Sequence, residues 1–166
     1  MRPPPLTPLA AAVLHVPVPE RALEIECGDG DGVFFLAREF PAARVRGVDR
    51  SEDAVRAATG RVGLDPEGRV AFKQGKPRSL PYPDGMFDLV AQTRGTLYVT
   101  EVTRVLRPGG HLIYVERPRW RWLRSRLPSL RSGLQRRGFE VIHAEQVAGL
   151  PFYVGRLRGD GRPAHE

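Results

Sequence analysis

Short apolar runs alternate with amphipathic segments along the chain, a pattern that predicts strands alternating with helices. Glycine or proline turns bound the apolar runs, as expected for buried strands of a parallel sheet. The predicted strands are residues 22–27, 43–49, 69–75, 87–92 and 111–116. Three helices are predicted. The first covers residues 33–40, and the second begins at Glu52 with Ser51 as its cap. The third covers residues 96–106, and the sequence RPGG is expected to end it.

Residues 139–147 and 151–158 are two further β-rich runs and predict an antiparallel pair that closes the sheet. Strands that alternate with helices favour right-handed crossovers. The predicted fold class is therefore α/β, a three-layer sandwich with a mainly parallel seven-stranded sheet ending in an antiparallel hairpin. Residues 1–166 are expected to form one domain, with 1–20 as an N-terminal extension. A ligand site is expected at the carboxyl ends of the strands.

The composition is that of a soluble globular protein. Hydrophobic residues make up 41% of the 166 residues and charged residues 27%, and no apolar run approaches the roughly 20 residues of a membrane helix. Prolines interrupt the apolar patch near the N-terminus, which argues against a signal peptide. Cys27 is the single cysteine, so no intramolecular disulfide can form, and a cytoplasmic location is expected.

The formal net charge of +7 comes from one part of the chain. Segment 117–137 contains no acidic residue, and without its eight arginines the net charge would be −1. These are Arg117, Arg119, Arg121, Arg124, Arg126, Arg131, Arg136 and Arg137. Interleaved with Trp120 and Trp122, they suit binding to nucleic acid or to an anionic membrane. The alternative is a connection and helix that cover the sheet with tryptophan while the arginines face water.

A glycine-rich turn, CGDGDG, follows the first predicted strand. Gly28 and Gly30 allow the backbone to turn sharply and to approach a ligand closely. Asp49 ends the second strand 19 residues after Gly30, and an acid about 20 residues after such a turn commonly binds ribose hydroxyls. Val33 stands where the dinucleotide fingerprint requires glycine, so the pattern favours a nucleoside over a dinucleotide.

Four phrases, in this order, resemble class I S-adenosylmethionine-dependent methyltransferases of the small-molecule type: LEIECGDGDG, VRGVDRSEDAV, LPYPDGMFDLV and VTRVLRPGGHLIYVE. The resemblance covers residues 22–116 and extends more weakly to Arg158. It implies a Rossmann-like fold, S-adenosylmethionine as the cofactor, and methyl transfer to a small-molecule acceptor. Because the cofactor's sulfonium is already activated, catalysis is mainly alignment of the acceptor, and no general base is predicted.

The resemblance also implies roles for residues at the carboxyl edge of the sheet. Glu24 and the backbone at Gly28 and Gly30 would hold the methionine part of the cofactor. Asp49 would accept hydrogen bonds from the ribose, and Arg50 would flank the adenine.

Gln92 and Thr93 follow the fourth strand and would line the position beside the reactive methyl.

Three features depart from the family pattern. Glu26 replaces the first loop glycine, and Lys76 replaces an adenine-side acid and cannot accept a hydrogen bond. Segment 92–96 is too short for a lid helix, so we expect an open site. A second copy of the chain or another protein is expected to cover it.

These departures leave two function classes open. One is methyl transfer, and the other is a non-catalytic methyltransferase-like module that binds a nucleoside, nucleic acid or protein partner. Glu26 is expected to weaken the loop, because a side chain at glycine-like backbone angles costs about 1 kcal/mol, while a nearby arginine is expected to neutralise its carboxylate. The four histidines, His15, His111, His143 and His165, have no metal-ligand spacing, so no metal site is predicted.

Overall fold

The computed structural model describes residues 6–117 and 127–159. Its strands are β1 (Arg21–Ile25), β2 (Arg44–Asp49), β3 (Val70–Gln74), β4 (Phe87–Gln92), β5 (Leu106–Val115), β6 (Phe139–Val147) and β7 (Leu150–Leu157). Its helices are α1 (Thr7–Ala12), the 3-10 helix η1 (Val13–His15), α2 (Asp31–Glu39), α3 (Glu52–Gly60), α4 (Val99–Val105) and α5 (Leu127–Arg136).

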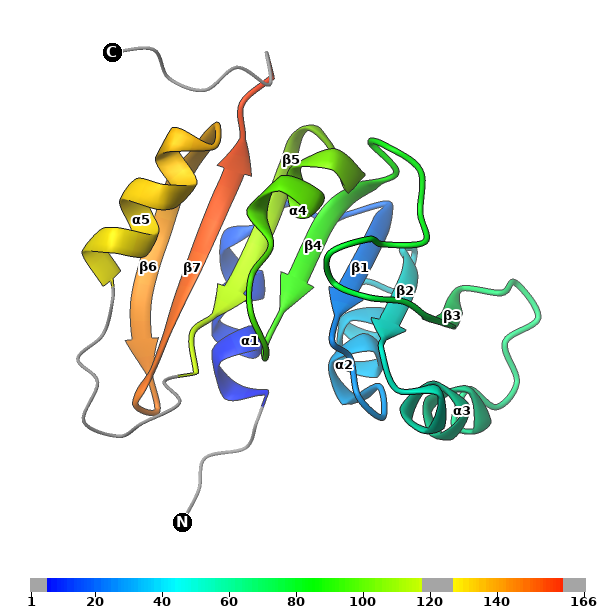
Figure 1. The fold of residues 1–166 in the computed structure, drawn as a ribbon. Helices are drawn as coiled ribbons and strands as arrows, with labels where there is room; N and C mark the ends of the chain where they lie inside the picture. The colour runs from blue at the N-terminus through cyan, green and yellow to red at the C-terminus, as the bar shows by residue number, and fades with distance from the viewer. Residues whose placement is uncertain (1–5, 118–126, 160–166) are drawn as a thin grey trace.

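The strands form one sheet of order β3-β2-β1-β4-β5-β7-β6 (Figure 1). Strands β1 to β5 pair in parallel, and β7 runs antiparallel to both β5 and β6. The predicted fold class, a mainly parallel seven-stranded α/β sandwich that ends in an antiparallel hairpin, is therefore confirmed. The chain order reverses between β1 and β4, whose carboxyl ends form a switch point of the kind at which α/β proteins bind ligands.

Helices cover both faces of the sheet: α1 and α2 lie on one face, α4 and α5 on the other (Figure 1). Neighbouring residues of β1 point to opposite faces. Ala22 packs with Leu9 and Leu36 in one core, and Leu23 packs with Val102 in the other. Each of these side chains is at most 1% exposed. Within the described ranges, no helix has the length and apolar character needed to cross a membrane.

The N-terminal residues contribute a helix to the sandwich. Helix α1 begins at Thr7 with Pro8 in its first turn, where proline's missing N–H costs nothing. Leu9 and Ala12 are fully buried, and α1 packs against β5, β6 and β7. Residues 7–15 of the predicted extension are thus part of the packed structure.

The sequence RPGG lies inside a strand, so the prediction that it ends a helix is wrong. Helix α4 ends at Val105, and β5 begins at the next residue and includes residues 107–110. The pairing of β5 with β4 shifts in register here, and Gly109 has a φ of +80°, which allows the irregular backbone. The helix itself spans residues 99–105 rather than the predicted 96–106.

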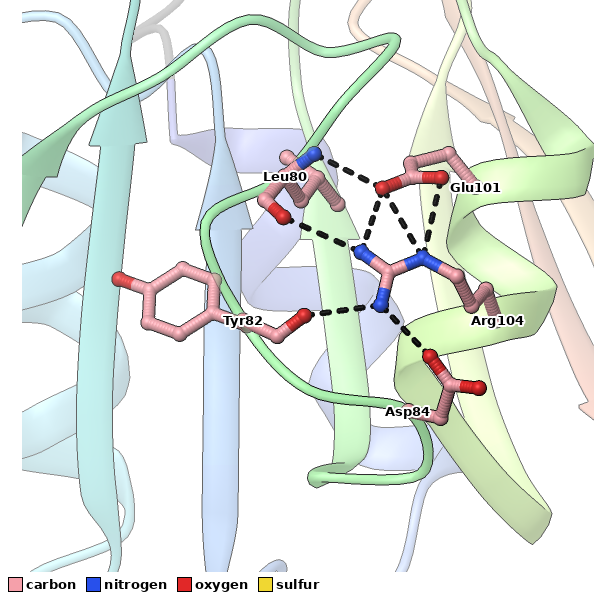
Figure 2. Close-up of polar contacts among 5 residues, drawn as sticks. All are labelled: Leu80, Tyr82, Asp84, Glu101 and Arg104. Carbon is pink, nitrogen blue, oxygen red and sulfur yellow. Dashed lines mark hydrogen bonds and ion pairs between the residues drawn. The ribbon is translucent and has the colours of Figure 1, made fainter.

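One arginine of α4 holds the loop that leads into β4 (Figure 2). Arg104 donates to the carbonyl oxygens of Tyr82 (2.8 Å) and Leu80 (3.1 Å). It also donates to the carboxylates of Asp84 (2.8 Å) and Glu101 (2.5 Å). Glu101 in turn accepts the Leu80 N–H (2.8 Å), and the hydrogen bonds from Arg104 lower the pKa of Glu101. The carbonyl and carboxylate groups of this cluster therefore have partners, whereas the buried Tyr82 hydroxyl has none, and the predicted Pro-Asp-Gly turn is fixed against the helix.

Candidate active site

The glycine-rich turn after β1 is held by the carboxylate at the end of β2. Asp49 accepts the Gly28 N–H at Oδ2 (2.8 Å) and the Ser51 N–H at Oδ1 (2.9 Å). Ser51 caps α3 as predicted, because its Oγ accepts the Ala54 N–H (3.2 Å). Asp49 is 7% exposed, and each carboxylate oxygen has capacity for a further donor. It links the turn to α3 and can still accept hydrogen bonds from a ligand.

Two glycines of this segment have neighbouring side chains close to their backbone, and Gly28 also has a positive φ that favours glycine. Gly28 has a φ of +57°, and a Cβ there would lie 2.8 Å from Arg94 Nη1. A Cβ on Gly32 would overlap the Glu24 carboxylate. The backbone at Gly28 therefore packs against the Arg94 guanidinium, and the backbone at Gly32 packs against the Glu24 carboxylate.

Glu26 occupies a backbone position that favours glycine. Its φ is +57°, in the left-handed region where a side chain costs about 1–2 kcal/mol. Arg50 Nη2 donates to Glu26 Oε1 (2.6 Å), and the Glu26 side chain is only 10% exposed while that of Arg50 is 65% exposed. A Cβ on Gly95 would lie 3.2 Å from Glu26 Cγ, so the side chain packs against the loop after β4. The expected strain and the expected neutralising arginine are both present.

Glu24 is a buried acid whose hydrogen bonding is incomplete. It is 1% exposed, Thr93 donates its hydroxyl to Oε1 (3.3 Å), and Oε2 has no hydrogen-bond partner. Burial raises the pKa of Glu24 to about 8, against the opposing influence of Arg94, the Thr93 hydroxyl and the Val33 backbone N–H. A cation placed beside this carboxyl group would stabilise its ionised form.

Gln92 organises the loop that follows β4. Its Nε2 donates to the carbonyl oxygens of Arg94 (2.9 Å) and Thr96 (3.0 Å), while its Oε1 is buried without a partner. Gln92 is 0% exposed and Thr93 is 4% exposed. The structure therefore shows Gln92 holding the loop and Thr93 bonded to Glu24, and contact of either with a methyl group stays a prediction.

Two arginines at this edge were missed as site residues. Arg94 lies over Gly28, and Arg117 Nε donates to the Thr93 carbonyl (2.7 Å) directly after β5. Burial, and then the neighbouring Arg94, lower the pKa of Arg117. Both residues stand within two positions of the carboxyl end of a parallel strand, which is the sequence signal that could have identified them.

Residues 22–110 match the family described as a methyltransferase domain. The chain belongs to the methyltransferase domain family. Membership confirms the resemblance to class I enzymes and implies S-adenosylmethionine as the cofactor. A solved S-adenosylmethionine-dependent methyltransferase from Aquifex aeolicus has the same fold, with a TM-score of 0.74 over 94% of both chains at 16% identity.

Two curated methyltransferases are similar in sequence. The chain is 37% identical over 109 residues to the fatty-acid O-methyltransferase of Mycolicibacterium smegmatis. The aligned residues make up 61% of this chain and 39% of that protein. It is 31% identical over 139 residues to phthiotriol/phenolphthiotriol dimycocerosates methyltransferase 1 of Mycobacterium ulcerans. These aligned residues make up 79% of this chain and 50% of that protein. The chain thus spans half or less of the length of these relatives.

The carboxyl edge of the sheet has hydrogen-bond acceptors suited to this cofactor. Asp49 offers carboxylate oxygens to ribose hydroxyls, and the partnerless oxygen of Glu24 suits a cationic amino-acid part. The backbone at Gly28 provides the close approach that the turn requires, although Arg94 lies over it. The residues present therefore fit the cofactor, provided that the Arg94 side chain rotates away from Gly28.

The other predicted residues are Lys76, which follows the carboxyl end of β3, Cys27 and the arginine-rich segment. Lys76 is exposed and forms an isolated antiparallel bridge with Ser79. Cys27 is buried, and burial raises the pKa of its thiol to about 12, in agreement with a packing role. Most of the predicted arginine-rich segment, residues 118–126, lies outside the described residues. Three of its described arginines, Arg131, Arg136 and Arg137, are exposed on or just after α5.

Proposed function

We propose that this chain binds S-adenosylmethionine and directs methyl transfer to the carboxylate oxygen of a small amphipathic acid. The observation that carries the choice of acceptor is the position of two arginines at the carboxyl ends of β4 and β5: Arg117 donates to the carbonyl of Thr93, the residue that precedes Arg94. An anion bound between them would offset their mutual repulsion. The name of the M. smegmatis relative, a fatty-acid O-methyltransferase, supports the same acceptor chemistry.

A carboxylate acceptor asks little of the protein. It is already ionised at neutral pH, so the reaction needs no general base from the chain. The cofactor, when bound, supplies an activated methyl group. The contribution of the chain is alignment: Asp49 and Glu24 hold the donor side, and the Thr93 carbonyl fixes the position of the Arg117 guanidinium for the acceptor.

A cavity of about 320 Å³ beside the start of α4 offers room for the apolar part of such an acid. Leu97, Tyr98 and Val99 form its apolar lining, and its polar lining consists of Arg78, Thr100, Glu101 and Arg137. The three apolar residues follow Arg94 and Thr93 in the chain. A short hydrocarbon tail would contact the apolar part of this lining, and the volume is at the low end for ligand pockets.

The test measures S-adenosylhomocysteine release with carboxylic acids of increasing chain length and with alcohols of the same lengths. We expect turnover of acids and not of alcohols. Arg117→Gln should raise KM for the acid by at least tenfold, because a charge-assisted hydrogen bond worth about 1.5–3 kcal/mol is lost. Its affinity for S-adenosylhomocysteine should change by less than about twofold. Arg38→Gln, which removes an exposed arginine at the end of α2, is the matched control.

Equal turnover of acids and alcohols would contradict the proposed acceptor while keeping methyl transfer. Cofactor binding without turnover of any acceptor would instead favour the non-catalytic module.

We further propose that a second copy of the chain or another protein covers this edge, because Arg94, Gly95 and Thr96 are exposed there. Light scattering with and without S-adenosylhomocysteine tests this.

Binding of nucleic acid or an anionic membrane through residues 117–137 is a separate prediction. A steep loss of affinity with salt, abolished in an Arg131→Glu/Arg136→Glu variant, would support it. A cytoplasmic location also stays a prediction.

A further inference from the structure

The fold brings together three side chains that carry metal-binding atoms: His15, His143 and Glu145. None of them belongs to the glycine-rich turn. His15 ends η1, and His143 and Glu145 lie two positions apart on β6, so they share one face of that strand. One ring nitrogen of each histidine and one carboxylate oxygen all lie within 4.8 Å of one another. Their positions in the chain gave no sign of this, because η1 and β6 are near opposite ends of the described sequence.

The distance between His143 and Glu145 is close to that between two ligands of one metal ion. His143 Nε2 and Glu145 Oε2 are 3.1 Å apart, and two ligand atoms of a tetrahedral zinc, each about 2.0–2.1 Å from the metal, stand about 3.3 Å apart. The His15 and His143 rings stack with centroids 3.6 Å apart and planes 13° from parallel. Shared coordination requires the His15 ring to turn out of this stack, because a metal ion lies in the plane of each imidazole that binds it.

The surroundings support the histidines from one side and leave the other open. The Phe152 ring lies 6.5 Å from the His15 ring and 5.7 Å from the His143 ring, between centroids. The side chains of His143 and Glu145 are 31% and 51% exposed. Water can therefore reach the cluster and complete a coordination sphere.

We propose that His15, His143 and Glu145 bind a late first-row divalent metal ion, with Zn²⁺ as the preferred ion and water as the remaining ligand. Two imidazoles and one carboxylate suit zinc, nickel or copper, whereas magnesium and calcium prefer oxygen ligands alone. The bound metal joins η1 to the outermost strand β6 and so fastens the N-terminal segment to the antiparallel side of the sheet.

Calorimetric titration of the full chain with ZnCl₂, after removal of any affinity tag and of bound metal, tests the site. We expect one equivalent of Zn²⁺ to bind. His15→Ala and His143→Ala should each weaken binding at least tenfold, and Glu145→Gln by about three- to tenfold. Glu140→Gln, which removes another exposed acid of β6, is the matched control and should bind as the unchanged chain does.

Two further readouts separate a metal site from a simple stack of rings. Zn²⁺ should raise the melting temperature of the unchanged chain and slow hydrogen exchange at residues 13–16, and both effects should be absent in His15→Ala. Co²⁺ should give visible absorption typical of nitrogen and oxygen ligation.

Failure to bind Zn²⁺ at millimolar concentration would overturn the proposal, as would equal binding by the unchanged chain and the two histidine variants. If His143→Ala fails to fold, the exposed His15 and Glu145 variants still decide the outcome. Affinity for S-adenosylhomocysteine should be unaffected throughout.

Discussion

Two buried acids at opposite edges of the same sheet differ in how completely they are hydrogen-bonded. At the amino edge, Asp88 accepts the N–H groups of Glu20 (2.8 Å) and Arg21 (2.9 Å) and forms an ion pair with Arg107 (3.3 Å). At the carboxyl edge, Glu24 accepts the Thr93 hydroxyl at Oε1, while Oε2 has no hydrogen-bond partner. Both acids are less than 9% exposed, so solvent access does not explain the difference.

Four buried side-chain atoms of the described residues have no hydrogen-bond partner: Glu24 Oε2 and Gln92 Oε1 lie at the carboxyl edge, and Arg69 Nε and Tyr82 Oη are the other two. A buried polar atom without a partner costs about 1–3 kcal/mol, so it is retained most readily where binding supplies the missing partner. The Arg104 cluster in Figure 2 belongs with Asp88, because its carboxylates and carbonyl groups are bonded within the chain.

Arg104→Ala should produce the largest effect, on stability alone. The substitution removes hydrogen bonds to two backbone carbonyls and two carboxylates, and we expect the free energy of unfolding to fall by about 3 kcal/mol. Urea denaturation measures this. Arg56→Ala, which removes an exposed i,i+4 ion pair on α3, should cost less than about 0.5 kcal/mol. Similar losses in both variants would contradict a structural role for the cluster.

The next effect is a pH dependence at Glu24. Its pKa of about 8 lies well above the ordinary value, so the folded chain keeps a proton that the unfolded chain releases. The free energy of unfolding should therefore fall as pH rises from about 4.5 toward 8. The positive charges of S-adenosylmethionine favour the ionised acid, so its affinity should rise by up to about tenfold per pH unit below pH 8.

Calorimetry in buffers of different ionisation enthalpy would detect the proton released on binding. Glu24→Gln should abolish this release and flatten both pH profiles. A pH-independent affinity in the unchanged chain would show that Glu24 does not respond to the cofactor.

Glu26→Gly should have a smaller effect, in the favourable direction. Glycine relieves the left-handed backbone strain and frees Arg50, so S-adenosylhomocysteine should bind roughly tenfold more tightly, equivalent to about 1.4 kcal/mol. Direct titration of both proteins gives the comparison. Weaker binding would mean that Glu26 is itself a ligand for the ammonium group.

Much of the fold could be predicted from local patterns. Apolar runs locate all seven strands because both faces of the sheet are covered, and Ser51 and Asp49 could be assigned because their partners lie nearby in chain order. The RPGG segment was misassigned, because its glycines permit an irregular strand as well as a helix end, and only the pairing with β4 decides between them.

The site was less predictable because its chemistry depends on distant residues. The Arg94 guanidinium lies over Gly28 only because β1 and β4 are neighbours in the sheet. The partner of Glu26 was expected to be an arginine, but the sequence offers 24 of them, and only the structure selects Arg50. The His15–His143 contact likewise depends on where α1 and η1 pack.

The most direct test of the central claim is calorimetric titration of S-adenosylhomocysteine into the unchanged chain, Asp49→Ala and Asp53→Ala. Asp49 holds the turn and faces the ligand edge, whereas Asp53 is 90% exposed on α3. We predict measurable binding to the unchanged chain, a loss of about 100-fold (about 2.7 kcal/mol) in Asp49→Ala, and no change in Asp53→Ala. Absence of heat at millimolar ligand, or equal binding by all three proteins, would contradict a cofactor site at the carboxyl edge.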